Sequence, residues 1–359
     1  MENKKNVTIR DIAAQAGCSV ALVCNALSGN GRIGKESKKR ILEIADSLGY
    51  IPNRSAQSLS KNEISIGVVL PRKPHVIQNA FLDSIKHTFE SDVCRVKCEV
   101  RLYDQSDKER LFALKSLEGK IDGLIVEMND PQTNELRDYL LEYNRFEIPA
   151  VGLVLAPGIL NTIATVSSDV KTSAAIAAQM LALKGCKRVC IISGEAGADI
   201  HKKTSFYFKE KIKEYPLTLS CEDSSMDDPV TAYRIAERVL KNNSADSFYV
   251  TSYLSPAVCA AVKDSGTENV TVIGTDYYNE VKKLLIDGTQ FAAVFQNQKE
   301  QARHASNLLL NHLLHLPTEP LLKGCLIKPE LILRSNADCY YAPESGEKFT
   351  CRAIKQNRI

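Results

Sequence analysis

Small and polar side chains that can read DNA bases stand at helical spacing in residues 19–28. Ser19 can cap a helix and can also donate to a phosphate, an anion that the N-terminus of a helix favours. Val20 and Ala21 can offer apolar contact to a thymine methyl group, and Asn25 can form two hydrogen bonds with adenine. On a helix that enters the major groove, these residue types could contact bases and phosphates.

Two short helices joined by a tight turn would position those side chains. Thr8 can cap a first helix, and Gly17 supplies the backbone freedom that the turn needs. The apolar residues of this first helix fall at one face and are Ile9, Ile12, Ala13 and Ala16. Val23 and Leu27 are the expected buried pair of the second helix. The pattern predicts a helix-turn-helix, whose second helix enters the major groove of DNA.

A third amphipathic helix is predicted over residues 35–48, and it completes a small core. Its apolar face consists of Ile41, Leu42, Ala45 and Leu48. Residues 1–61 hold ten Lys or Arg and five Asp or Glu, a net charge of +5, whereas the whole chain carries +3. A basic module attached to a nearly neutral body suits contact with phosphates. A basic, solvated helical face is the alternative explanation of the charge alone.

The composition restricts the class of protein. With 359 residues, 44% hydrophobic and 25% charged, the chain can form two or three domains. No apolar run approaches ~18 residues, so no membrane span is expected. The first residues, MENKKNVTIRD, lack the apolar core of a signal peptide, and we expect a cytoplasmic protein. The eleven scattered cysteines do not form the paired motif of a zinc site and are expected to be reduced thiols.

The rest of the chain alternates between strand-like and helix-like segments. The expected strands are 64–71, 97–104, 121–127, 148–155, 188–194, 246–252, 270–276 and 291–296. The expected helices are 80–89, 107–118, 170–183, 230–240 and 256–265. This alternation predicts an α/β core of doubly wound parallel sheets, divided into two lobes near residues 153–165. The segment after Cys339 has no clear periodicity and is expected to be loosely ordered.

The chain resembles the LacI/GalR family of bacterial transcription regulators. The resemblance runs from Val7 to about Asn336 and rests on TIRDIAAQAGCS, RILEIADSLGYIPN and AQSL, followed by the strand IGVVLP. Later matches are KIDGLI, VSSD, VIGTD and FQ. The resemblance implies a helix-turn-helix domain over 1–52, a hinge helix over 53–62, a two-lobed periplasmic-binding-protein-like core over 63–338 and a tail over 339–359. It also implies a homodimer that binds operator DNA and a small molecule, often a sugar or a nucleobase.

The resemblance also implies which residues would contact DNA. They are Thr8, Arg10, Ser19, Val20, Ala21, Asn25, Ser28, Arg32, Asn53, Ala56, Gln57 and Leu59. Asn25 stands where many members carry arginine, and Leu22 and Cys24 replace the usual phosphate-binding Thr and Ser, so we expect a distinct operator. Leu59 matches the leucine that the hinge helix inserts between base pairs. Alternatively, Leu59 packs on its own core lobe, and Val20, Ala21 and Leu22 pack in the helical core.

Ligands of doubly wound lobes bind beyond the carboxyl ends of the strands. The candidate ligand-binding residues are Arg72, Ser193, Lys202, Thr251, Asp276 and Gln296. Asp276 and Gln296 match family pocket positions, whereas Arg72 replaces a frequent acidic residue. A cationic mouth of the pocket would favour a phosphorylated or acidic sugar. A plain surface loop is the alternative interpretation of Arg72 and Lys73.

These observations favour a transcription regulator, expected to be a repressor, over two alternatives. A solute receptor of a transporter would share the core but would not need a DNA-binding module. An enzyme would need a catalytic motif, and no GxSxG, Walker or HExxH pattern is present. We therefore expect no catalytic residues, no metal site, no cofactor and no membrane contact. Order in the hinge helix would respond to the ligand through the arrangement of the lobes.

Overall fold

The computed structural model describes residues 9–28, 34–48, 63–72, 75–90, 95–104, 106–195, 198–314 and 324–343. Contacts divide the chain into two compact units, residues 1–61 and 62–359. The predicted hinge residues Asn53, Ala56, Gln57 and Leu59 lie outside the described residues, as do Thr8 and Arg32. The predicted side-chain contacts of Asn25 and Ser28 also lie outside what the structure describes.

The described residues of the first unit form three helices: α1 (Ile9–Ala16), α2 (Val20–Ser28) and α3 (Lys35–Ser47). Gly17 has a φ of +63° in the turn between α1 and α2, a conformation that glycine adopts without strain. The fully buried core of the unit is Ile12, Ala13, Ala16, Val23, Ala26, Ile41 and Ala45. The predicted face of α1 is confirmed at Ile12, Ala13 and Ala16, and Ile9 packs against it partly buried. The predicted burial of Val23 in α2 is also confirmed, whereas the side chain of Leu27 lies outside the described residues.

The predicted apolar face of α3 is wrong at Leu42, whose side chain is 41% exposed. At about 100° per residue, Leu42 lies about 100° around the helix from Ile41 and about 160° from Ile44, so it falls outside the stripe that faces the core. Ile44, three residues after Ile41, packs against the core instead.

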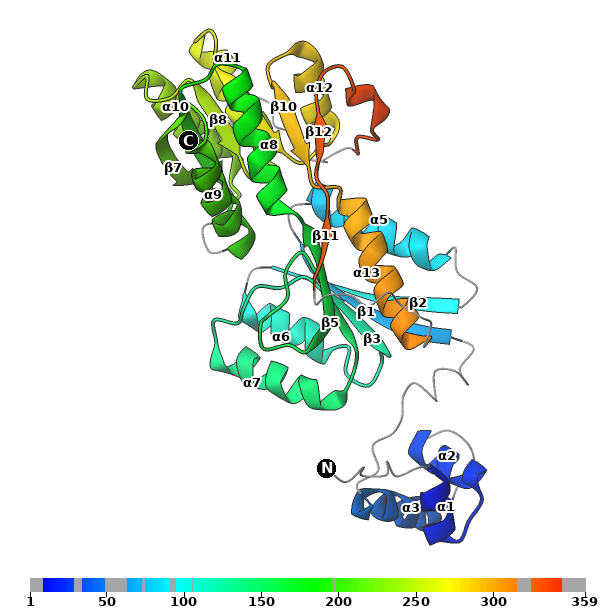
Figure 1. Ribbon diagram of the computed structural model, residues 1–359. Helices are drawn as coiled ribbons and strands as arrows, with labels where there is room; N and C mark the ends of the chain where they lie inside the picture. The colour runs from blue at the N-terminus through cyan, green and yellow to red at the C-terminus, as the bar shows by residue number, and fades with distance from the viewer. Residues whose placement is uncertain are drawn as a thin grey trace. The chain divides into compact units, whose positions relative to one another are not determined.

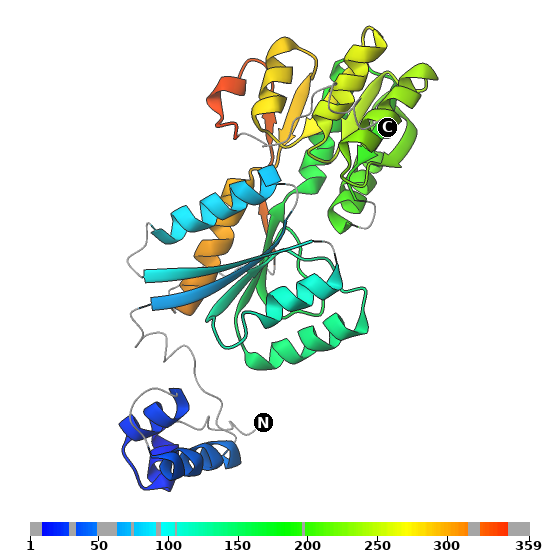
Figure 2. The same ribbon diagram turned by 180° about the vertical axis from the view of Figure 1, so that it is seen from behind.

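The second unit contains two six-stranded sheets (Figure 1). In sheet A the strands pair in the order β11-β5-β4-β3-β1-β2, and every pair is parallel. Their bounds are β1 Glu63–Pro71, β2 Arg95–Tyr103, β3 Gly123–Val126, β4 Ala150–Leu153, β5 Thr162–Ser168 and β11 Gly324–Ile327. Helices α5 (His75–Glu90) and α13 (Gln298–Leu313) lie side by side on one face, and α6 (Asp107–Lys115) and α7 (Asn134–Tyr143) on the other (Figures 1 and 2).

Sheet B has the order β12-β10-β9-β8-β6-β7, in which only the β10–β12 pair is antiparallel. Its strands are β6 Arg188–Ser193, β7 Thr218–Ser224, β8 Ser247–Val250, β9 Thr271–Thr275, β10 Ala292–Phe295 and β12 Glu330–Ile332. One face packs against α8 (Val170–Leu183) and α9 (Asp199–Ile212). The other packs against α10 (Pro229–Lys241), α11 (Ser255–Ser265) and α12 (Asn279–Asp287). The predicted doubly wound α/β core is confirmed.

The predicted boundary between the lobes, near residues 153–165, is wrong. Strand β5 covers part of that interval and pairs with β4 inside sheet A. The chain passes to sheet B only after Ser168, returns after β10 to place α13 on sheet A, and crosses again between β11 and β12. The Ala156-Pro157-Gly158 break is a turn between two neighbouring strands of one sheet.

The sequence patterns missed several elements for identifiable reasons. Strand β7 lies at a sheet edge and is partly exposed along its length, so it lacks a buried apolar run. Strands β11 and β12 are short and mostly exposed or half-buried, so they too lack a buried apolar run. The helices α7, α9, α12 and α13 carry many polar residues and were not predicted.

Two further differences concern cysteines and the C-terminal segment. Cys190 on β6 and Cys221 on β7 form a disulfide, whereas the expectation of free thiols holds for Cys18, Cys98, Cys186, Cys259, Cys325 and Cys339. Tyr340 packs edge-on against Tyr277 and Phe295, so the described start of the tail, 339–343, is ordered against the core. No helix in the described ranges combines the length and apolarity needed to cross a bilayer.

Candidate functional site

The leading end of α2 presents its side chains to solvent. Val20 is 43% exposed, and Ala21 and Arg10 are exposed as well. Leu22 is partly buried and packs against the helical core, so core packing applies to it and not to Val20 or Ala21. The Ser19 Oγ accepts a hydrogen bond from the Leu22 backbone N–H at 3.2 Å, which caps the helix. The first turn of α2 is thus accessible to solvent.

The second unit encloses a cavity of about 150 Å³ between its two sheets. Its walls include residues that directly follow parallel strands of both sheets, which is where doubly wound folds bind ligands. Sheet A contributes Tyr103 and Glu127, at or just after the ends of β2 and β3. Sheet B contributes Thr251, Asp276 and Gln296, which follow β8, β9 and β10.

Three of the six predicted ligand residues therefore line this cavity: Thr251, Asp276 and Gln296. The other three are elsewhere. Arg72 is exposed, and its Nε lies 3.3 Å from the Asp104 carboxylate. Lys202 is exposed on α9 and lies 3.8 Å from Asp199. The Ser193 Oγ donates to the Asp223 carbonyl at 3.3 Å.

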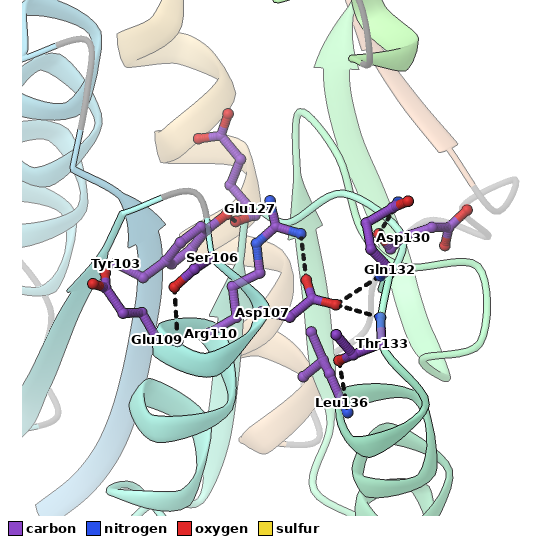
Figure 3. A network of polar contacts seen from close by, with 10 residues as sticks. All are labelled: Tyr103, Ser106, Asp107, Glu109, Arg110, Glu127, Asp130, Gln132, Thr133 and Leu136. Atoms are coloured by element: carbon purple, nitrogen blue, oxygen red, sulfur yellow. Dashed lines mark hydrogen bonds and ion pairs between the residues drawn. The ribbon is translucent and has the colours of Figure 1, made fainter.

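The Arg110 guanidinium forms part of the cavity wall on the side of sheet A, and Asp107 holds it in place (Figure 3). Arg110 on α6 donates from Nη1 to the Asp107 Oδ1 at 3.1 Å, and both side chains are 6% exposed. The Asp107 Oδ2 accepts two backbone N–H groups, from Gln132 and Thr133, each at 2.7 Å. The Arg110 guanidinium also lies over the Tyr103 ring, 5.4 Å from its centroid. These contacts fix Arg110 at the cavity.

Glu127 adds a carboxyl group to the same wall. The Tyr103 hydroxyl donates to the Glu127 carbonyl oxygen at 2.5 Å, while the Glu127 side chain extends away from the Arg110 guanidinium (Figure 3). Burial raises the pKa of Glu127 to about 8, because the charged carboxylate loses water without gaining a cation. Burial raises the pKa of Tyr103 as well.

The wall on the side of sheet B carries further acidic groups. Asp276 is 4% exposed, and its Oδ1 accepts a hydrogen bond from the Gln298 Nε2 at 2.5 Å. Burial raises the pKa of Asp276 to about 7, and the nearby charge of Asp227 acts in the same direction. Burial also raises the pKa of Asp227. The backbone at Asp276 and Asp227 is left-handed, with φ of +73° and +55°.

His201 lies against these carboxyl groups as a neutral ring. Burial lowers its pKa to about 4, and its Nδ1 is 3.3 Å from the Thr251 Oγ1. A Cβ at Gly194 would collide with both the Asp227 carboxyl and the His201 ring, so glycine is what lets the two side chains fit here. The cavity therefore combines a neutral imidazole with several acids.

Sequence reasoning missed Arg110, Glu127, Asp227 and His201. Glu127 closes the predicted strand 121–127, so the strand-end rule could have identified it. Asp227 and His201 follow or belong to elements that were not predicted, and Arg110 lies on a helix whose own pattern gives no sign of a cavity. Only the packing of the lobes brings these four together.

Comparison with known families gives two matches on one chain. The family described as bacterial regulatory proteins, lacI family, matches residues 8–53. The family described as periplasmic binding protein domain matches residues 66–315. The first match covers the three-helix unit, and the second covers most of the two-lobed core, in agreement with the predicted resemblance.

Curated relatives are similar over about half of the chain or more. Catabolite control protein A of Priestia megaterium is 31% identical over 216 residues, 58% of this chain and 62% of that protein. The ribose operon repressor of Bacillus subtilis is 31% identical over 194 residues, 53% of this chain and 55% of that protein. The chain thus matches less than two thirds of the length of either relative.

Solved structures share the fold at low sequence identity. The lac repressor bound to ONPG aligns over 91% of this chain and 98% of its own, with a TM-score of 0.64 and 16% identity. A solute-binding protein of an ABC transporter from Burkholderia graminis, in complex with D-arabinose, aligns over 77% and 98%, with a TM-score of 0.69 and 17% identity. At these identities the likeness concerns the fold.

Proposed function

We propose how this chain acts on DNA, because it belongs to the lacI family of bacterial regulatory proteins. Members of this family are regulators and not enzymes. A dimer binds an inverted-repeat operator and represses transcription there. A small molecule, a sugar or a sugar derivative, binds the cavity between the two sheets and changes the affinity for DNA. The observation that carries the proposal is the presence of an exposed α2 end and a polar, strand-end cavity on one chain.

The helical unit supports the DNA-binding half of the proposal. A capped helix with exposed small residues at its first turn suits entry into the major groove, where the helix N-terminus can also approach phosphates. Two-fold symmetry of a dimer would then match two half-sites. Asn25 remains the predicted reader of adenine, and Leu59 the predicted wedge of a hinge helix. A regulator of this kind would work in the cytoplasm, where the DNA is.

The cavity supports the effector half of the proposal. Carboxyl, amide and hydroxyl groups from Asp276, Gln296 and Thr251 can bind the hydroxyls of a sugar. The names of a ribose operon repressor and of an arabinose complex among similar proteins point to the same ligand class. A ligand that prefers one arrangement of the lobes would shift the population that is competent to bind DNA.

Binding-site selection from random duplexes, followed by gel shift on the selected site, tests the proposal. We expect an inverted repeat to be selected, and we expect residues 62–359 alone not to bind it. Val20→Glu should weaken binding by about tenfold or more, because a carboxylate at the base-reading end repels phosphates.

Leu42→Glu is the matched control, since Leu42 is exposed to a similar extent, 41% against 43%, but lies on α3. Its effect should be several times smaller. Full retention of specific binding by residues 62–359, or equal losses in the two variants, would contradict the proposed DNA-binding surface.

A further inference from the structure

The charges that line the cavity do not balance. Arg110 is the one Lys or Arg side chain among the described residues of the lining, whereas four acids line it: Glu127, Glu195, Asp227 and Asp276. They come from both lobes, since Glu127 follows β3 of sheet A, and Glu195, Asp227 and Asp276 follow β6, β7 and β9 of sheet B. Four carboxyl groups therefore surround a small volume that contains one guanidinium.

The single guanidinium is already neutralised inside the protein. Arg110 pairs with Asp107 at 3.1 Å, and Asp107 is itself buried and does not line the cavity (Figure 3). The pair as a whole carries no net charge. No charge of Arg110 is left to compensate the four acids of the lining.

Among the described residues of the lining, no other cation compensates the acids. Asp276 accepts from Gln298, a neutral amide, and the pKa of Glu127 is raised by burial alone. His201 is neutral above a pKa of about 4. Buried carboxylates without a cation are costly, and two of these, Asp227 and Asp276, also repel each other. The cavity is thus lined by acids that no described cation matches, and burial raises the pKa of Glu127 and Asp276 so that they keep their protons toward neutral pH.

A second, independent feature points to a ligand that donates hydrogen bonds. Gln301 lines the cavity and is 1% exposed, and within the described part of the chain its Oε1 has no hydrogen-bond partner. Its Nε2 is used, because it donates to the Gln296 carbonyl at 2.8 Å. A buried acceptor without a donor costs free energy unless a ligand supplies one. The lining therefore offers the Gln301 acceptor beside its four acids, while the Arg110 Nε is a buried donor that also has no partner among the described residues.

We propose that the effector is a cationic polyol, a small sugar that carries a primary amine, and that its ammonium group binds among Asp227, Asp276 and Glu195. This inference rests on the proposed effector role of the cavity. An ammonium group supplies three donors and the missing positive charge. A phosphate or carboxylate would add negative charge to four acids, so the phosphorylated or acidic sugar considered from the sequence fits this lining poorly. The volume of about 150 Å³ limits the ligand to a small molecule.

Calorimetric titration of the full chain with matched sugar sets tests this assignment. Each set holds the amino, hydroxyl, N-acetyl and 6-phosphate forms of one hexose: D-glucosamine, D-glucose, N-acetyl-D-glucosamine and D-glucose 6-phosphate, and the equivalent forms of galactose and mannose. In at least one set the amino form should bind about tenfold or more tightly than its neutral and phosphorylated counterparts. Tighter or equal binding of a neutral or phosphorylated form, or no measurable binding of any amino form, would overturn the proposal.

Asp227→Asn removes one charge without changing the size of the side chain, and asparagine tolerates the positive φ at this position. It should weaken binding of the amino sugar by about tenfold and change binding of the hydroxyl form much less. Equal weakening of both forms would mean that Asp227 acts only as a hydrogen-bond acceptor and would refute the charge argument. Asp199→Asn is the control, because Asp199 is 58% exposed and does not line the cavity.

Operator binding, measured on the same samples without sugar, separates the two proposals. Loss of the amine preference with intact operator binding would refute only the cationic effector. Absent operator binding with an intact amine preference would refute only the regulatory role.

Discussion

Two carboxyl groups of the core, Asp107 beside sheet A and Asp276 beside sheet B, are compensated in opposite ways. On sheet A, the Arg110 guanidinium meets a carboxylate that also accepts two backbone N–H groups, so the charge is matched within the protein. On sheet B, Asp276 and Asp227 face the cavity with a neutral amide and a neutral imidazole beside them. The difference indicates that the Asp107–Arg110 pair stabilises the fold, whereas Asp276 and Asp227 are available to bind a ligand.

The contrast follows from the cost of removing charge from water. A buried ion pair recovers that cost only when its geometry is good and its remaining lone pairs are bonded, as they are at Asp107. A buried carboxyl without a cation responds instead by holding its proton, which is why the pKa of Asp276 rises to about 7. Burial therefore accompanies a matched ion pair at Asp107, whereas at Asp276 it raises the pKa of the carboxyl group to about 7.

The largest expected effect comes from breaking the matched pair. Asp107→Ala leaves the buried Arg110 charge and two backbone N–H groups without their acceptor. We expect the free energy of unfolding of the core to fall by about 3–5 kcal/mol, measured by urea denaturation. Asp199→Ala removes an exposed pair with Lys202 and should cost less than about 1 kcal/mol. Similar losses in the two variants would contradict the structural role of the Asp107–Arg110 pair.

A smaller, pH-dependent effect is expected at the unmatched acids. The folded-state pKa of Asp276 is raised from its ordinary value of 3.8 to about 7. Below pH 4 both the folded and unfolded chains hold this proton, and no stability is lost. As pH rises to about 7, the unfolded chain ionises first, so the folded state loses stability, on the order of a few kcal/mol at most.

Asp276→Asn removes this dependence, and asparagine suits its φ of +73°. Relative to the natural chain, the variant should therefore gain stability between pH 4 and pH 7, as measured by urea unfolding at several pH values. Glu127, which acts in the same direction, and His201, which acts in the opposite direction, are present in both proteins and cancel in the difference. A constant difference across this range would show that Asp276 titrates normally.

The smallest effect should come from the ring beneath Arg110. Tyr103→Phe keeps the ring that the guanidinium overlies but removes the hydroxyl that donates to the Glu127 carbonyl. One such hydrogen bond contributes about 1 kcal/mol, and we expect a loss of that size in urea unfolding. A loss as large as that of Asp107→Ala would mean that the hydroxyl, not the ion pair, positions this wall.

The helical unit was largely predictable because its signals are local. The spacing of Ile12, Ala13 and Ala16, together with Gly17, was sufficient to define α1 and the turn that follows it. The prediction was wrong at Leu42, which points away from the stripe formed by Ile41, Ile44 and Ala45. The three buried or partly buried cavity residues Thr251, Asp276 and Gln296 were also found, because each follows a strand that the sequence makes recognisable.

The sequence by itself determined the helix-turn-helix, the family and the parallel strands, because these depend on residue spacing and on apolar runs within short segments. Only the tertiary structure decided the character of the cavity. Asp107 and Arg110 neutralise each other, whereas Asp227, Asp276 and Glu127 meet from separate elements without a cation. Whether a buried charge is matched depends on its neighbours in space, and no spacing along the chain specifies them.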